Sequence, residues 1–142
     1  MLDANILIYA HHADTRQHAA ARAWFEKQLA GTDIVGLTWA TIWAFIRVST
    51  NAKLWSRPPA LEEVFDRIAE WQSLPNVVLL EPGPRHRQIL KSLALESDAR
   101  GAMISDAVLS AIAIEHAATL VSTDRDFRRF SGLRWMNPLE DD

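Results

Sequence analysis

Aspartate carboxylates follow two short apolar runs of this chain at the points where strands would end. Asp3 follows the first two residues, and Asp124 and Asp126 follow the run 119–122. The carboxyl ends of parallel strands meet at one edge of a sheet, so these side chains are expected to converge there. Asp106, near the start of a helical segment, is the third candidate contributor.

Converging carboxylates repel one another unless a cation neutralises them or one of them takes a proton. Oxygen ligands without cysteine or histidine suit Mg²⁺ or Mn²⁺. Such an ion can activate a bound water and stabilise phosphate oxygens during an in-line displacement. The pattern therefore predicts metal-dependent hydrolysis of a phosphodiester or a phosphomonoester.

Each aspartate also has a purely structural interpretation. Asp3 can begin a turn, and Asp106 can interact with a helix dipole from the first turn. Asp124 and Asp126 can form an Asx turn with a helix cap. Only the joint placement of the four at one sheet edge favours a site.

Apolar periodicity predicts short strands that alternate with helices, which is typical of an α/β fold with a mainly parallel sheet. The segment 39–50 is apolar almost all round, which predicts a helix buried in the core or at a subunit interface. The run 77–80 is expected to be a buried strand. The further helices are expected from an Asn5 cap to residue 10 and over 16–29, 61–74, 85–95 and 105–118, with one turn at 126–130; the further strands are expected over 33–37, 119–122 and 133–136.

Length and composition narrow the class of protein. The 142 residues predict one domain over 1–142. The chain has no cysteine, which excludes disulfides and thiolate zinc sites and fits a reducing cytoplasm. No apolar run reaches the roughly 18–20 residues of a membrane span, and no secretory signal opens the chain.

The formal net charge of -3 argues against a nucleic-acid partner, but its distribution does not. Glu140, Asp141 and Asp142 form an acidic tail. The remaining chain balances its basic and acidic side chains at 15 each, and 12 of the basic ones are arginine. The arginine guanidinium binds phosphate through two parallel hydrogen bonds.

Other chemistry is less well supported. His11, His12 and His18 lack a partner cluster and are expected to be solvated. The six tryptophans are expected in core or interface packing rather than base stacking. Glycine-rich nucleotide-binding loops are absent from the sequence, and no serine has the partners of a nucleophile.

Three segments resemble the motifs of PIN-domain ribonucleases, in family order over nearly the whole chain. They are Leu-Asp-Ala-Asn-Ile-Leu-Ile-Tyr-Ala at 2–10, Ser-Asp-Ala at 105–107, and Leu-Val-Ser-Thr-Asp-Arg-Asp-Phe at 120–127. The last is similar to the family's Thr-x-Asp-x-Asp-Phe motif. The group that these segments resemble is the VapC toxins of bacterial toxin–antitoxin modules.

The resemblance implies a three-layer sandwich, a central mainly parallel sheet flanked by helices. It implies Mg²⁺- or Mn²⁺-dependent RNA cleavage in the cytoplasm, homodimers, and inhibition by a VapB-type antitoxin whose tail covers the acidic site. By the same match, Asp3 and Asp106 are the principal metal ligands, and Asp124 completes the set with Asp126 close behind. Asn5 and Thr123 are expected to orient the carboxylates.

The sequence departs from the family pattern in two places. The family usually has a glutamate in the third helix, where this chain has Ala44 in the segment Ala-Phe-Ile-Arg-Val at 44–48. This loss puts a second metal ion in doubt. The stretch before Asp3 is also short for a first strand, so we expect either a start further upstream or a shortened strand.

The leading hypothesis is an endoribonuclease toxin whose basic side chains grip the RNA backbone near the motifs. A catalytically weak module that binds RNA or an antitoxin is the main alternative, because of Ala44. A phosphatase or a phosphate-accepting receiver domain also places an aspartate after a parallel strand, but neither predicts the Asp106 helix. The candidate RNA contacts are Arg47, Arg125, Arg128 and Arg129.

Overall fold

Short parallel strands and longer helices alternate along the chain. The computed structural model describes residues 1–140, so Asp141 and Asp142 of the expected acidic tail lie outside the described residues. The elements are α1 (Ala4–His11), α2 (His18–Ala30), β1 (Val35–Leu37), α3 (Trp39–Ser49), α4 (Leu61–Ser73), β2 (Val77–Leu79), α5 (His86–Ser97), α6 (Ala102–Glu115), β3 (Thr119–Val121), η1 (Arg125–Arg129) and β4 (Arg134–Met136).

The first two residues join two pairs of parallel strands. β1 pairs with β2 and β3 pairs with β4, both in parallel. Leu2 forms a parallel bridge to Val121 and donates its backbone N–H to the carbonyl of Gly36 over 2.9 Å. The resulting order is β2, β1, Leu2, β3 and β4, with every carboxyl end at one edge.

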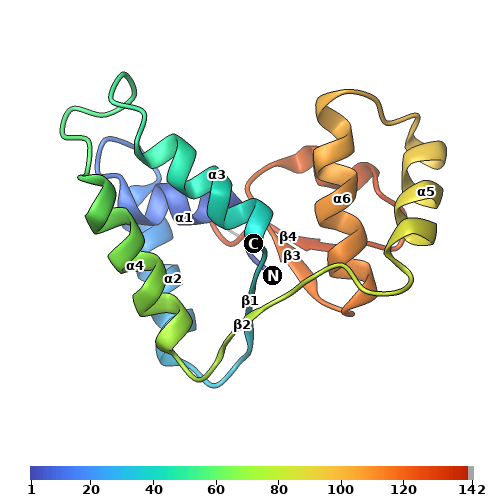
Figure 1. Ribbon diagram of the computed structural model, residues 1–142, viewed down its shortest axis with the longest axis horizontal. Helices are drawn as coiled ribbons and strands as arrows, with labels where there is room; N and C mark the ends of the chain where they lie inside the picture. The colour runs from blue at the N-terminus through green and yellow to red at the C-terminus, as the bar shows by residue number, and fades with distance from the viewer. Residues whose placement is uncertain (141–142) are drawn as a thin grey trace.

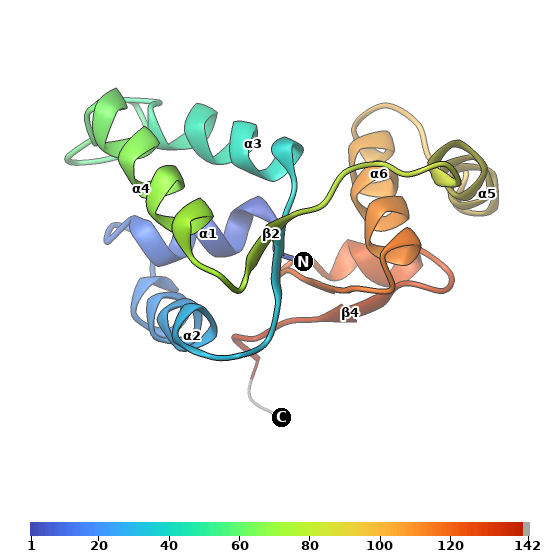
Figure 2. The same cartoon turned by 60° about the horizontal axis from the view of Figure 1, so that its bottom comes forward.

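Helices cover both faces of these strands (Figure 1). α1 to α4 gather on one side, and α5 and α6 lie on the other, an arrangement also visible in the turned view (Figure 2). The side chain of Leu2 belongs to the apolar core under α1 to α4, whereas that of Met1 belongs to the core under α6. The expected three-layer α/β sandwich is confirmed. Within residues 1–140, no helix has the length and apolar character needed to cross a membrane.

Two segments expected to be buried are only partly buried within the single chain. The strand predicted at 77–80 is the edge strand β2, so it is only half-buried and Leu79 is exposed. The helix predicted at 39–50 buries one face through Thr41, Ile42 and Phe45, but Trp43 on the opposite face is 63% exposed. The apolar pattern of the sequence did not distinguish the exposed face of this helix, because exposed side chains on it are themselves apolar tryptophans.

A buried chain of hydroxyl groups ties the start of α3 to the residue before Asp3. Thr38 caps α3 by accepting from the backbone N–H of Thr41 over 3.1 Å, and it donates to the Thr41 hydroxyl. The Thr41 hydroxyl in turn donates to the carbonyl of Leu2 over 3.1 Å. The cap therefore fixes the helix against the segment that carries Asp3.

Replacement of Thr38 by alanine is expected to lower the free energy of unfolding by about 1–2 kcal/mol, because a buried helix cap is lost. Thr38→Ser should retain most of the stability. Denaturant unfolding of both variants tests this, with the exposed Thr50→Ala as the control, expected within about 0.5 kcal/mol of the parent. Equal losses of stability for Thr38→Ala and Thr50→Ala would show that the Thr38 cap stabilises the fold no more than an exposed threonine does.

Candidate functional site

Asp3 is held from two sides at the start of α1. One carboxylate oxygen accepts the backbone N–H of Ala4 over 2.7 Å, so Asp3 is the N-cap of the helix. The other accepts from the hydroxyl of Ser122 over 2.6 Å. The expectation that Asn5 caps this helix is wrong, because α1 already begins at Ala4.

Ser122 is the hub of the site. Its side chain is fully buried. Its hydroxyl accepts from the Asn5 amide over 2.9 Å and from the backbone N–H of Asp124 over 3.0 Å, while it donates to Asp3. The residue predicted to orient the carboxylates was Thr123, but the hydroxyl that contacts Asp3 is that of Ser122. Asn5 acts on Asp3 through the same hydroxyl.

Asp124 and Asp106 approach Asp3 from two further elements. Asp124 caps η1 by accepting the backbone N–H of Asp126 over 2.8 Å, so the Asx-turn interpretation is correct for its geometry. Asp106 lies in the second turn of α6, which begins at Ala102, three residues before the expected start. This position removes the interpretation of Asp106 as a first-turn carboxylate.

The electrostatics show that these carboxylates act on one another. Burial raises the pKa of Asp3 above its usual value, and repulsion from Asp124 adds to the rise, while the Ser122 hydrogen bond opposes it. Burial also raises the pKa of Asp106, followed by repulsion from Asp124 and Asp3. Negative charge at this point of the molecule is therefore costly without a counterion.

The donor set fits a hard divalent cation that keeps much of its water. The described part of the chain contains no group of three or more acidic or histidine side chains close enough to enclose an ion directly. Mg²⁺, however, is usually bound through only one or two carboxylates and retains several waters. The amide oxygen of Asn5 is buried beside Ser122 without a hydrogen-bond partner in the described structure, as expected for an acceptor that faces a hydrated ion.

The predicted arginines differ in their partners, and Arg47 lies at the end of α3 away from the Thr38 cap. Arg129 contacts the carboxylate of Asp126 at 3.2 Å. Arg125 and Arg128 both contact Glu140. Arg47 is exposed in the last turn of α3, and no ion pair of its side chain is found among residues 1–140. Ala44 lies half-buried in the middle of the same helix, so α3 brings no carboxylate from that position.

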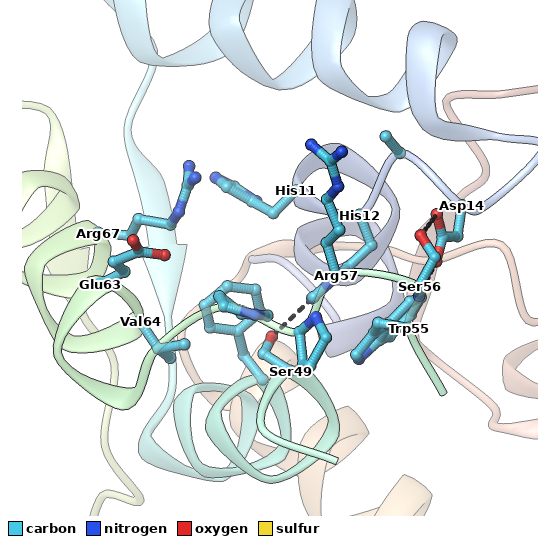
Figure 3. Close-up of a pocket in the computed structure, with 14 residues that line it drawn as sticks. His11, His12, Asp14, Ser49, Trp55, Ser56, Arg57, Glu63, Val64 and Arg67 are labelled. Carbon is cyan, nitrogen blue, oxygen red and sulfur yellow. Dashed lines mark hydrogen bonds between the residues drawn. The ribbon is translucent and has the colours of Figure 1, made fainter. Parts of the chain in front are cut away.

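His11, His12 and His18 lie near the other end of α1, and residues 1–140 contain no group of three histidine or acidic side chains placed to hold a metal ion. His11 and His12 line a pocket of about 400 Å³ with Arg57 and Arg67 (Figure 3). His12 is buried, stacks on Trp55 and contacts the Ser49 hydroxyl over 2.8 Å.

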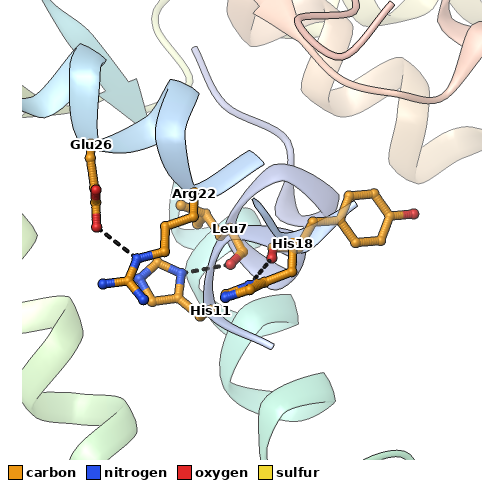
Figure 4. Close-up of polar contacts among 6 residues, drawn as sticks. Leu7, His11, His18, Arg22 and Glu26 are labelled. Carbon is orange, nitrogen blue, oxygen red and sulfur yellow. Dashed lines mark hydrogen bonds and ion pairs between the residues drawn. The ribbon is translucent and has the colours of Figure 1, made fainter. Parts of the chain in front are cut away.

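The side chains of His11 and His18 contact backbone carbonyl groups rather than one another. His11 donates from Nδ1 to the carbonyl of Leu7 and His18 to that of Tyr9 (Figure 4). Burial lowers the pKa of His11 to about 4. The expectation of solvated histidines is wrong for His11 and His12. The ring of His11 packs among aromatic side chains of α2, α3 and α4, and the ring of His12 packs against Phe45 and Trp55.

Comparisons with known proteins agree along nearly the whole chain. The model of the PIN domain family matches residues 1–133. A Mycobacterium tuberculosis protein named Ribonuclease VapC31 is 40% identical over 141 residues, which cover 97% of each chain. Ribonuclease VapC37 of the same organism is 37% identical over 138 residues, which cover 97% of this chain and 96% of the relative.

Solved structures share the fold at lower identity. The structure of VapBC-1 from nontypeable Haemophilus influenzae has a TM-score of 0.71 at 19% identity and covers 99% of this chain and 98% of that one. Mycobacterium tuberculosis VapC20, described as a sarcin-ricin loop cleaving toxin, has a TM-score of 0.66 at 14% identity, covering 94% of this chain and 97% of its own.

Replacement of Ser122 by alanine is expected to cost about 1–3 kcal/mol of stability, because two donors and the Asp3 carboxylate lose a buried partner. The pKa of Asp3 should rise further, so the loss should grow as the pH increases. Denaturant unfolding across a pH series tests this, with Thr123→Ala as the control. An equal loss in the control would contradict the assignment of Ser122 as the hub.

Replacement of Asp106 by asparagine is expected to stabilise the metal-free protein. The raised pKa means that ionised Asp106 opposes folding, so stability should decrease as pH rises through that pKa. The melting temperature should increase by about 1–3 °C near pH 7, a small gain because the group is partly exposed and screened.

The gain should vanish near pH 3, where the carboxyl is neutral in both states. Thermal melts in chelator at both pH values test this, with the exposed Asp33→Asn as the charge-matched control. A lower melting temperature for Asp106→Asn near neutral pH would contradict the repulsion argument.

Proposed function

Because this chain belongs to the PIN-domain family, we propose that it is a metal-dependent endoribonuclease toxin of the VapC group, hydrolysing phosphodiester bonds of RNA. The family model spans residues 1–133, and the relatives at 37–40% identity are named as VapC ribonucleases. The observation that carries the proposal is the coupling of three carboxylates: burial raises the pKa of Asp3 and of Asp106, and Asp124 repels both.

In this proposal each residue of the cluster has a defined part. Asp3 and Asp106 hold Mg²⁺ or Mn²⁺, Asp124 completes the set, and Asp126 stands behind it. The ion supplies an activated water and stabilises charge on the phosphate oxygens. Ser122 fixes the orientation of the Asp3 carboxylate and positions Asn5 next to it.

The basic side chains bind the RNA backbone in the same proposal. Arg125, Arg128 and Arg129 lie on η1, which starts directly after Asp124. Guanidinium groups bind phosphate oxygens in pairs, so these side chains suit the strand on either side of the scissile bond. Arg47 is the candidate contact on α3.

We further propose a VapB-type antitoxin and a second copy of this chain as partners, with the activity in the cytoplasm. A structural neighbour is a VapBC2 complex from Rickettsia felis bound to promoter DNA, with a TM-score of 0.70 at 18% identity. The exposed pair Trp39 and Trp43 on α3 offers an apolar surface of the kind that protein interfaces use.

One observation favours the alternative, a module that binds RNA or its antitoxin with little turnover. Ala44 removes the usual glutamate, and no three carboxylates of the described chain enclose an ion directly. The rate of RNA cleavage distinguishes the two proposed functions, because binding is expected in both. The phosphatase interpretation has no comparable support.

The test is cleavage of a total-RNA pool by the purified chain with Mg²⁺, Mn²⁺ or chelator. Discrete fragments are expected only with metal, and Asp3→Asn and Asp106→Asn are each expected to lower the rate at least about a hundredfold. Asp33→Asn should cleave like the parent. A folded, metal-saturated chain that binds RNA without cutting it would establish the alternative; activity in Asp3→Asn would refute the ligand assignment.

A further inference from the structure

The carboxylate of Glu140 spans two arginines of η1. Arg125 contacts one oxygen through both Nε and Nη2, each over 2.8 Å, and Arg128 approaches the other oxygen at 3.9 Å. The arginine side chains are 68% and 59% exposed, whereas that of Glu140 is 34% exposed. The hydrogen bond from Arg125 holds the pKa of Glu140 below its usual value, so the carboxylate is ionised at neutral pH.

These arginines are also those that lie nearest in sequence to the acidic cluster. η1 begins at Arg125, immediately after its cap Asp124. The guanidinium of Arg128 lies over the ring of Trp135, 4.7 Å from its centre. Arg128 is therefore positioned by an aromatic side chain as well, and it does not depend on Glu140 for its placement.

A carboxylate and a phosphate compete for a guanidinium because both offer two oxygens to the same fork of N–H donors. Resting on the proposed ribonuclease function, we propose that Glu140 is an internal competitor of RNA that occupies Arg125 and Arg128 in the free chain. A phosphate of the substrate displaces it. The residue thereby sets the affinity for RNA and weakens binding at low salt.

The opposite role, a carboxylate that orients the arginines for RNA, predicts the opposite sign of the effect. Removal of a competitor strengthens binding, whereas removal of a positioning group weakens it. Salt gives a second distinction. In the parent chain, part of the counterion release is offset by the ion pair that must break, so the salt dependence should be shallower than in a variant without Glu140.

The variant is Glu140→Gln, and the probe is a fluorescent single-stranded RNA of about 12 nucleotides, titrated in chelator so that it stays uncut. Binding is expected to tighten about two- to fivefold at low salt, the range of an exposed ion pair. The slope of log K against log salt, between about 50 and 200 mM, should steepen by up to about 0.7.

The matched control is Glu26→Gln. Glu26 forms an exposed ion pair with Arg22 on α2 at 2.8 Å (Figure 4), so this change alters the net charge equally without touching η1. It is expected to leave the affinity within about 1.5-fold, since distant exposed charges are screened. Thermal melts of both variants report whether they fold like the parent.

A second pair of variants tests whether Glu140 affects RNA binding through Arg125. In Arg125→Gln the further change Glu140→Gln should bring no more than a small gain, because the arginine in close contact with Glu140 is gone and Arg128 lies 3.9 Å from it. Weaker binding by Glu140→Gln, or a gain equal to that of Glu26→Gln, overturns the proposal while the ribonuclease function stands. Failure of the parent and all variants to bind RNA overturns both.

Discussion

The architecture depends on Met1 and Leu2, which take the place of a central strand. The backbone of Met1 and Leu2 joins Gly36 of β1 to Val121 of β3, and Val121 donates back to the carbonyl of Met1 over 2.8 Å. Side chains alternate along a strand, so Met1 enters the core on one side and Leu2 the core on the other. The same backbone places Asp3 at the edge, where its N–H donates to Val121 over 3.0 Å. Fold and site are therefore fixed by one short ladder of hydrogen bonds.

Structural and functional interpretations of the aspartates turn out to be compatible. Asp3 caps α1 with one oxygen, and Asp124 caps η1 in the same way. A cap uses only part of the acceptor capacity of a carboxylate, which has about four lone-pair sites. The helix starts thus hold the carboxylates rigidly and leave oxygens free toward the cluster. Burial, with repulsion between the carboxylates added to it, raises the pKa of Asp3 and Asp106 and makes their ionised forms costly in the metal-free chain.

Much of the site was predictable, because the rule that ligands gather at the carboxyl ends of parallel strands needs only the strands and the residues that follow them. The role of Ser122 was missed although a signal was available. Ser122 lies two positions after the buried Leu120 and so shares its inward face, whereas Thr123 does not. The edge position of β2 was not predictable, because a short apolar run has the same sequence pattern at the centre and at the edge of a sheet. The contact of Glu140 with Arg125 was equally out of reach, because it joins an exposed tail residue to a helical turn 15 positions earlier.

In the proposed metal site, the alanine at position 44 would alter the balance between stability and metal affinity rather than the way in which α3 is fixed. α3 is fixed by Thr38, Thr41 and the backbone of Leu2, and none of these contacts involves Ala44. A glutamate there would add another carboxylate to a cluster in which Asp3 and Asp106 already repel Asp124. Its absence lowers the repulsion in the metal-free chain and removes one ligand at the same time. In the proposed site, an ion that retains its waters would tolerate this loss better than an ion that needs direct ligands.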